Sequence, residues 1–152
     1  MADKELERMN KVHFRPKGFH AVTPYLIVAD ANRMADFLKQ AFGAEELYCM
    51  RDDKGAIRHA EYRIDDSVLE LSNATEQFAP TSVALHLYVE DADAVFHRAL
   101  KAGATSQREP GDRFYGDREG GVVDPCGNQW YIATRKEDVS PEELERRMAQ
   151  PN

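Results

Sequence analysis

Histidine and carboxylate side chains alternate with apolar residues along one short segment of this chain. On a β-strand over residues 58–64, His59 and Glu61 would lie on the same face, because side chains alternate between the two faces. The two aspartates that follow are typical of a two-residue hairpin turn, which would place Glu61 opposite Glu70. Carboxylates in such positions serve as general bases, and carboxylates with imidazole bind divalent metal ions.

A second set of candidate residues belongs to an internal repeat of 61 positions. Residues 22–30 (VTPYLIVAD) match residues 83–91 (VALHLYVED), so that Tyr25 corresponds to His86. Each apolar run predicts a strand, and the aspartate that ends it is followed by a pattern typical of an amphipathic helix. In both patterns apolar residues recur at i, i+3, i+4, i+7 and i+8: Met34, Phe37, Leu38, Ala41 and Phe42, then Ala92, Val95, Phe96, Ala99 and Leu100.

The elements that follow each helix complete two similar halves. Both helices end in Gly-Ala, where glycine suits a left-handed C-cap. In the first half, turn residues separate strands predicted at 46–51, 58–64 and 68–72; in the second half only a final strand at 129–134 is clear, because prolines and glycines interrupt the rest. Each half therefore reads as βαβββ.

These elements predict a single α+β domain over residues 21–136, made of two modules at 21–76 and 82–136. Residues 1–20 form a charged N-terminal arm, which we expect to be partly ordered. Residues 137–152 form a C-terminal helix and tail; Ser140 is the expected N-cap, with proline directly after it.

Composition excludes several classes of function. The chain has 152 residues, with 20 basic and 27 acidic side chains and a formal charge of −7, which argues against nucleic-acid binding and against docking on anionic membranes. It has no apolar run long enough to span a membrane and no apolar signal core at its N-terminus. Two cysteines are too few for a disulfide framework, so we expect a reduced, cytoplasmic protein.

The tandem halves resemble the glyoxalase / bleomycin-resistance / extradiol-dioxygenase superfamily, also called vicinal oxygen chelate. The turn Asp124-Pro-Cys-Gly-Asn128 resembles the D-P-x-G-N turn that precedes the last strand in that family. The strings HAVTPYL at 20–26 and FYGDR at 114–118 are similar to a glyoxalase-like branch related to PhnB-type proteins. The resemblance covers residues 19–148.

The resemblance implies that the two modules form a cupped, mostly antiparallel sheet, with helices on its convex side. A homodimer is also implied, because such cups are often completed across a two-fold axis. Tyr115, on a glycine-rich loop after residue 112, is either a ligand contact at the mouth of the cup or part of an ordinary solvated loop. The side chains expected inside the cup are Tyr25, His59, Glu61, Arg63, Glu70, His86, Tyr88 and Tyr131.

The metal site of the superfamily is degenerate in this sequence. The four positions that hold the metal in metal-dependent members correspond here to Thr23, Glu70, Ala84 and Tyr131, of which only Glu70 is a credible ligand. We therefore expect no metal and no cofactor, with Arg63 paired to Glu61 or Glu70 and the histidines bound to tyrosine hydroxyls. The alternative is a displaced metal site that draws on His59, Glu70 and His86.

Three functions are compatible with such a cup. The favoured one is binding of a small, planar or carbonyl-containing molecule, with Tyr25, Tyr88 and Tyr131 as aromatic walls. The second is a lyase or isomerase in which Glu70 or Glu61 removes a proton next to a carbonyl group. The third is a structural or regulatory dimer without turnover. The cup residues are compatible both with ligand binding and with catalysis.

Overall fold

The computed structural model describes residues 1–9 and 11–150 and contains four helices and eight strands in that part of the chain. The first module consists of β1 (Tyr25–Val28), α2 (Ala31–Phe42), β2 (Glu45–Arg51), β3 (Ile57–Ile64) and β4 (Ser67–Asn73). The second module consists of β5 (Ala84–Tyr88), α3 (Ala92–Lys101), β6 (Thr105–Asp112), β7 (Asp117–Val123) and β8 (Gln129–Arg135). Outside the modules lie α1 (Ala2–Met9) and α4 (Pro141–Met148).

The strands form two four-stranded sheets with the same topology. The order is β1-β4-β3-β2 in the first sheet and β5-β8-β7-β6 in the second. In each sheet the first strand runs parallel to the last, and the remaining neighbours are antiparallel. The α+β class and the two tandem βαβββ modules predicted from the sequence are thus confirmed.

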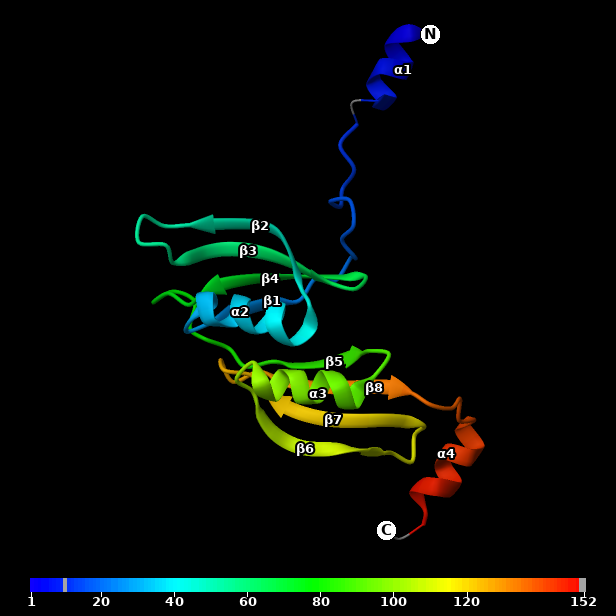
Figure 1. Cartoon of the computed structure of the whole chain (residues 1–152). Helices are drawn as coiled ribbons and strands as arrows, with labels where there is room; N and C mark the ends of the chain where they lie inside the picture. The colour runs from blue at the N-terminus through cyan, green and yellow to red at the C-terminus, as the bar shows by residue number, and fades with distance from the viewer. Residues whose placement is uncertain (10, 151–152) are drawn as a thin grey trace.

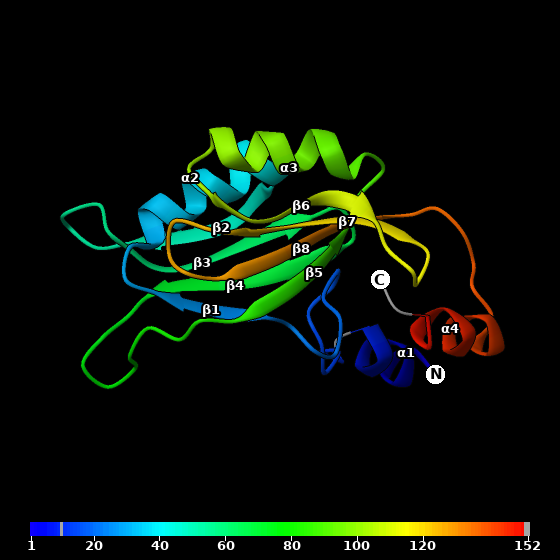
Figure 2. The same ribbon diagram turned by 90° about the horizontal axis from the view of Figure 1, so that it is seen from below.

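Both helices cover the same face of the two sheets, which lie edge to edge (Figures 1 and 2). The opposite face, which the helices leave uncovered, is called the open face below. Strand alternation produces this division: Ala60, Tyr62 and Ile64 of β3 are buried, while His59 and Glu61 between them are partly exposed.

The contact between α2 and α3 joins the modules into one core. Phe42 at the end of α2 packs on Trp130 of β8, with ring centroids 4.6 Å apart. The Arg98 Nε of α3 donates a hydrogen bond of 2.8 Å to the Ala41 carbonyl of α2. Most buried apolar residues of both halves belong to one cluster, so the modules share their hydrophobic stabilisation.

The start of each module helix is held in the same way. Asp30 and Asp91 are the N-caps that accept from the third following N–H, as their position before the helical patterns suggests. The first N–H of α2, on Ala31, donates to the Asn73 side chain, and that of α3, on Ala92, donates to the Thr134 hydroxyl. Because Asn73 and Thr134 also lie 61 positions apart, the repeat extends to these bonds.

Three features go beyond the sequence prediction or differ from it. The N-terminal arm contains helix α1, whose acidic first turn and Arg8 in its last turn suit the helix dipole. Strand β1 begins at Tyr25, which leaves Thr23 outside the strand. Strand β6 continues through Pro110 and Gly111; as an edge strand with two register shifts, it accommodates a residue without an N–H donor.

The C-terminal helix α4 begins after Ser140, whose hydroxyl accepts from the Glu143 N–H as predicted. Arg147 of α4 fastens the helix to the second module, because it bonds both the Phe114 carbonyl and the Glu137 carboxylate. None of the helices in the described part of the chain has the length and apolar character needed to cross a membrane.

Asp124 is the first residue of the D-P-C-G-N turn, which its side chain holds together, and it is 4% exposed. One carboxylate oxygen accepts from the Cys126 and Asn128 N–H groups, and the other accepts from the Trp130 indole at 2.9 Å. The substitution Asp124→Asn places an amide N–H against the indole N–H, and we expect it to lower the free energy of unfolding by about 1–3 kcal/mol.

Urea unfolding followed by circular dichroism measures this loss, with Glu76→Gln at an exposed position as the control for a lost charge. Equal stability of Asp124→Asn and the control would contradict the structural role of this turn.

Candidate functional site

The candidate residues of the first sheet form one group on the open face. The Tyr25 hydroxyl lies 3.3 Å from Nδ1 of His59, and the two rings are 5.8 Å apart between centroids. Nε2 of the same imidazole lies 3.6 Å from Glu70 and 3.9 Å from Glu61. All three side chains of this His–Glu–Glu group are about a quarter exposed, so solvent reaches them.

Strand pairing produces this arrangement. The Asp65-Asp66 turn joins β3 to β4 and sets Glu61 directly opposite Glu70, as the sequence predicts. Tyr25 of β1 is the parallel partner of Glu70. Among residues 1–9 and 11–150, no lysine or arginine nitrogen lies within 4.0 Å of either carboxylate, whereas Nε2 of His59 lies within that distance of both.

The N-terminal arm lies beside this first group. A cavity of about 420 Å³ is lined by arm residues, among them Phe14 and Phe19, together with Thr23, Glu61 and Glu70. The two carboxylates therefore face a space that is lined on its other side by the aromatic rings of the arm and by the polar side chains of Arg15 and His20. Such a space suits a ligand that has both an apolar part and a polar or proton-donating group.

The second sheet carries a separate group with shorter contacts. Nε2 of His86 lies 2.9 Å from one oxygen of Glu119, and the Tyr115 hydroxyl donates to the other oxygen at 2.7 Å. Glu119 is 5% exposed, whereas the His86 side chain is 39% exposed. A buried carboxylate thus orients an imidazole that remains accessible from the open face.

Asp117, two residues before Glu119, is likewise a buried carboxylate that accepts a hydrogen bond from a tyrosine hydroxyl. It is 2% exposed; one oxygen accepts from the Tyr88 hydroxyl at 3.2 Å, and the other lies 3.5 Å from Nη1 of Arg135. Burial raises the pKa of Tyr115 to about 12, and the bond to Glu119 and its charge add to the effect. Desolvation of its hydroxyl group, together with the charge and hydrogen bond of Asp117, raises the pKa of Tyr88.

Aromatic rings surround His86. Its ring centroid is 4.6 Å from that of Tyr88 and 6.4 Å from that of Tyr131, with the Tyr131 ring inclined by only 24°. Tyr88 is 57% exposed, and Tyr131 is partly exposed. The second sheet therefore presents an aromatic surface with a polar floor of carboxylates.

Two expected pairings are wrong. Arg63 bonds the exposed Glu45 across the β2–β3 pair instead of Glu61 or Glu70, because Glu45 is its direct cross-strand neighbour. His86 bonds Glu119, although His59 does contact a tyrosine hydroxyl as predicted.

The displaced metal set of His59, Glu70 and His86 is divided within one chain. His59 and Glu70 belong to the first sheet and His86 to the second, and the inner edge strands β1 and β5 are not paired with each other. The expected cup is accordingly present as two half-sites, one on each sheet.

Sequence reasoning missed Asp117 and Glu119. The repeat does place an equivalent of the first group there. Glu61 opposes Glu70 in the first sheet, and Gly121 opposes Tyr131 in the second. Glu119, two residues before Gly121, therefore occupies the position of His59, two residues before Glu61. The spacing in this strand is 60 instead of 61, so the constant offset points to Gly120. Strand pairing, and not a fixed offset, is the signal that would have found Glu119.

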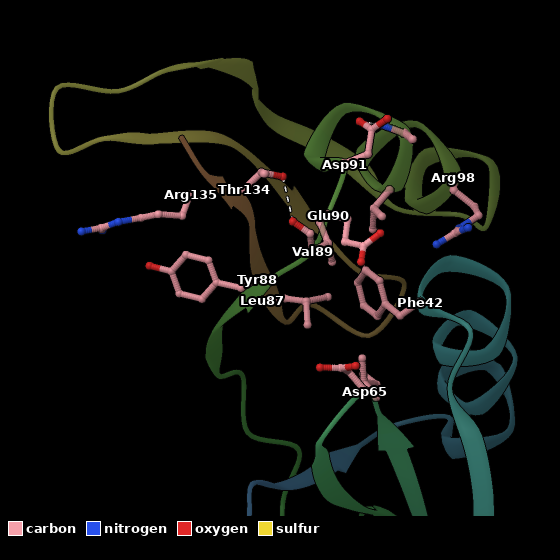
Figure 3. Close-up of a pocket in the computed structure, with 13 residues that line it drawn as sticks. Phe42, Asp65, Leu87, Tyr88, Val89, Glu90, Asp91, Arg98, Thr134 and Arg135 are labelled. Carbon is pink, nitrogen blue, oxygen red and sulfur yellow. Dashed lines mark hydrogen bonds between the residues drawn. The ribbon is translucent and has the colours of Figure 1, made fainter. Parts of the chain in front are cut away.

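A groove of about 790 Å³ lies between the modules. Figure 3 shows Phe42 and Asp65 of the first module facing Leu87 and Val89 near the end of β5. Tyr88 and Arg135 lie at one end of this groove, so it adjoins the second half-site.

Relatives of the chain are found in mycobacteria. Two uncharacterised proteins, from Mycobacterium bovis and Mycobacterium tuberculosis (strain ATCC 25618 / H37Rv), are 36% identical to it over 140 residues. The match covers 85% of this chain, 92% of the M. bovis protein and 82% of the M. tuberculosis protein.

Solved structures share the fold at lower identity. TioX from Micromonospora sp. ML1 superposes with a TM-score of 0.67 at 24% identity, covering 76% of this chain and 98% of TioX. TnmS3, an antibiotic binding protein from Streptomyces sp. CB03234, gives 0.62 at 21% identity, covering 82% and 100%. The fosfomycin resistance protein FosX from Mesorhizobium loti gives 0.58 at 21% identity, covering 86% and 98%.

The family model of the Glyoxalase/Bleomycin resistance protein/Dioxygenase superfamily matches residues 18–132, which is most of the chain and extends from before the first module into β8 of the second. The matched segment contains all the candidate residues of both half-sites except the arginine at the end of β8. The chain therefore belongs to the Glyoxalase/Bleomycin resistance protein/Dioxygenase superfamily.

Proposed function

We propose that this protein binds a small molecule with a planar or carbonyl-containing group on its open face. The observation that carries this proposal is the aromatic surface formed by Tyr88, His86 and Tyr131 above hydrogen-bonded carboxylates. Aromatic walls with a few fixed polar groups are typical of sites that orient a flat ligand. The likeness to TnmS3 and FosX, whose names concern antibiotics, agrees with this ligand class.

Two half-sites in one chain favour a homodimer. The His–Glu–Glu group and the His86 group lie on the open face of different sheets, and the two groups do not meet within the chain. In a two-fold dimer, the first sheet of one protomer facing the second sheet of its partner would enclose both groups. The proposed ligand would then contact His59 and Glu70 from one chain and Tyr131 from the other.

A lyase or isomerase is the second candidate function. Glu61 and Glu70 lie opposite each other without a lysine or arginine partner among the described residues. A carboxylate of this kind is free to accept a proton from a carbon next to a carbonyl group, and the neighbouring His59 is placed to return it.

Ligand affinity tests the favoured proposal. Calorimetric titration with a panel of quinoline and anthraquinone antibiotics measures binding to the purified protein. For a compound that binds, Tyr131→Ala should weaken the affinity by about fivefold, because an aromatic pair contributes about 1 kcal/mol. The control is Phe78→Ala, which removes an exposed aromatic ring from the connection after β4. Equal losses in both variants, or none in Tyr131→Ala, would move the site elsewhere.

Oligomeric state tests the composite site. Multi-angle light scattering of the full chain should give twice the mass of the 17.3 kDa protomer. A monomer at the concentrations used for the binding experiments would reject the shared cup while leaving each half-site as described.

Turnover of the hemithioacetal of methylglyoxal and glutathione tests the second candidate. Glu70→Gln should lower kcat by about 10²-fold or more, since loss of a general base removes that contribution. Glu45→Gln, which changes an exposed carboxylate on β2, is the matched control. Full activity in both Glu70→Gln and Glu61→Gln would exclude these carboxylates as the base, and an inactive wild-type protein would exclude this substrate.

A further inference from the structure

Two carboxylates are buried side by side under the second half-site. Asp117 and Glu119 point to the same side of β7 and are 2% and 5% exposed. Buried carboxylates are costly unless a positive charge or several hydrogen bonds compensate them. This pair therefore requires a compensating positive charge nearby, and the described residues supply that charge only in part.

Arginines near the pair compensate it only in part. Nη1 of Arg135 is 3.5 Å from Asp117, and the same guanidinium, half exposed, also bonds Asp138. Arg113 is close to Glu119, yet its guanidinium donates to the main-chain oxygens of Glu109 and Glu119 instead of the carboxylate. In the described part of the chain, the side-chain nitrogen within 4.0 Å of the Glu119 carboxylate is Nε2 of His86.

Tyrosine hydroxyls fix one oxygen of each carboxylate. Tyr88 holds Oδ2 of Asp117, and Tyr115 holds Oε1 of Glu119. The remaining oxygens are Oε2 of Glu119, which faces Nε2 of His86, and Oδ1 of Asp117, which is buried without a hydrogen-bond partner among the described residues. Outer partners that orient ligands in this way are typical of metal centres.

One possible ligand atom from each of His86, Asp117 and Glu119 lies within 4.8 Å of the other two. One imidazole nitrogen and two carboxylate oxygens suit a divalent first-row transition metal such as Zn²⁺, Mn²⁺, Fe²⁺ or Co²⁺. The two positive charges would balance the two carboxylates, and three protein ligands leave a position for water or a ligand atom on the side of the open face.

We propose that His86, Asp117 and Glu119 bind a divalent transition-metal ion. None of these residues occupies the positions that hold metal in the superfamily, which correspond to Thr23, Glu70, Ala84 and Tyr131. The proposal goes beyond small-molecule binding and does not depend on it. When a metal ion replaces Arg135 beside Asp117, Arg135 keeps its ion pair with Asp138.

The group in the first sheet supplies the internal comparison. His59, Glu61 and Glu70 offer the same ligand types with atoms equally close together. Their carboxylates are about a quarter exposed, so water solvates them and the need for a compensating cation is smaller. We therefore expect the metal in the second sheet.

The experiment uses the full chain without an affinity tag, freed of metal by a chelator and titrated with Co²⁺ and with Zn²⁺. Cobalt absorption reports the geometry of the ligands, and calorimetry gives the number bound and the affinity. We expect one ion per chain. His86→Ala and Glu119→Gln should each weaken binding at least 100-fold, and Glu61→Gln, the matched change in the first sheet, should leave it unchanged.

Tyr115→Phe is the second variant, for the case that Glu119→Gln fails to fold. It keeps all three ligands and removes only the hydroxyl that orients Glu119, so binding should weaken by about 10- to 100-fold. Circular dichroism and thermal unfolding without metal confirm that each variant is folded.

Three results would overturn the proposal. The first is the absence of saturable binding at millimolar metal, and the second is unchanged affinity in folded Glu119→Gln or Tyr115→Phe protein. The third is a loss of binding in Glu61→Gln alone, which would assign the ion to the first sheet. Because the probe is the metal by itself, failure of the proposed small-molecule binding would leave these outcomes unaffected.

Discussion

The packing of α2 against α3 is the contact on which the arrangement of this protein depends. It buries the apolar faces of both helices and both sheets in one core, with Phe42 of the first module against Trp130 of the second. Since the helices meet on one side, the polar faces of both sheets are turned to the other side. Neither module buries its apolar surface alone, and the position of each half-site follows from this shared core.

The two half-sites lie on sheets of the same strand order, but they differ in how far their carboxylates are buried. In the first sheet, the carboxylates are partly solvated and share a single histidine. In the second sheet, the carboxylates are buried and each is held by a tyrosine hydroxyl. Burial thus determines the chemistry of each group: the first resembles a proton acceptor in contact with solvent, and the second resembles a fixed anionic site that requires a cation.

The sequence predicts the modules well because their signal is periodic and repeated. The helix patterns and the Asp65-Asp66 turn are local features, and each lies where the sequence indicates. Strand alternation also predicts that His59 and Glu61 share a face with Glu70. These successes depend on spacing within one element or one hairpin.

The rest depends on contacts that spacing does not determine. Arg63 has several acidic neighbours in reach, and only the β2–β3 register selects Glu45. Glu119 is missed because its strand is shifted by one position relative to the repeat. His59 and His86 are separated because they lie on different sheets, which are joined through their helices. A list of the residues that face inward does not show this separation.

The one-residue difference between the two repeats separates the residues of the open face from those of the core. Equivalent positions of β3 and β7 are 60 residues apart, whereas those of β4 and β8 are 61 apart, and a longer turn precedes β8 than precedes β4. The polar residues of the two half-sites therefore differ, although the apolar residues of both modules belong to one core. The open face of one module is thus replaceable without any change in the side chains that hold the two modules together.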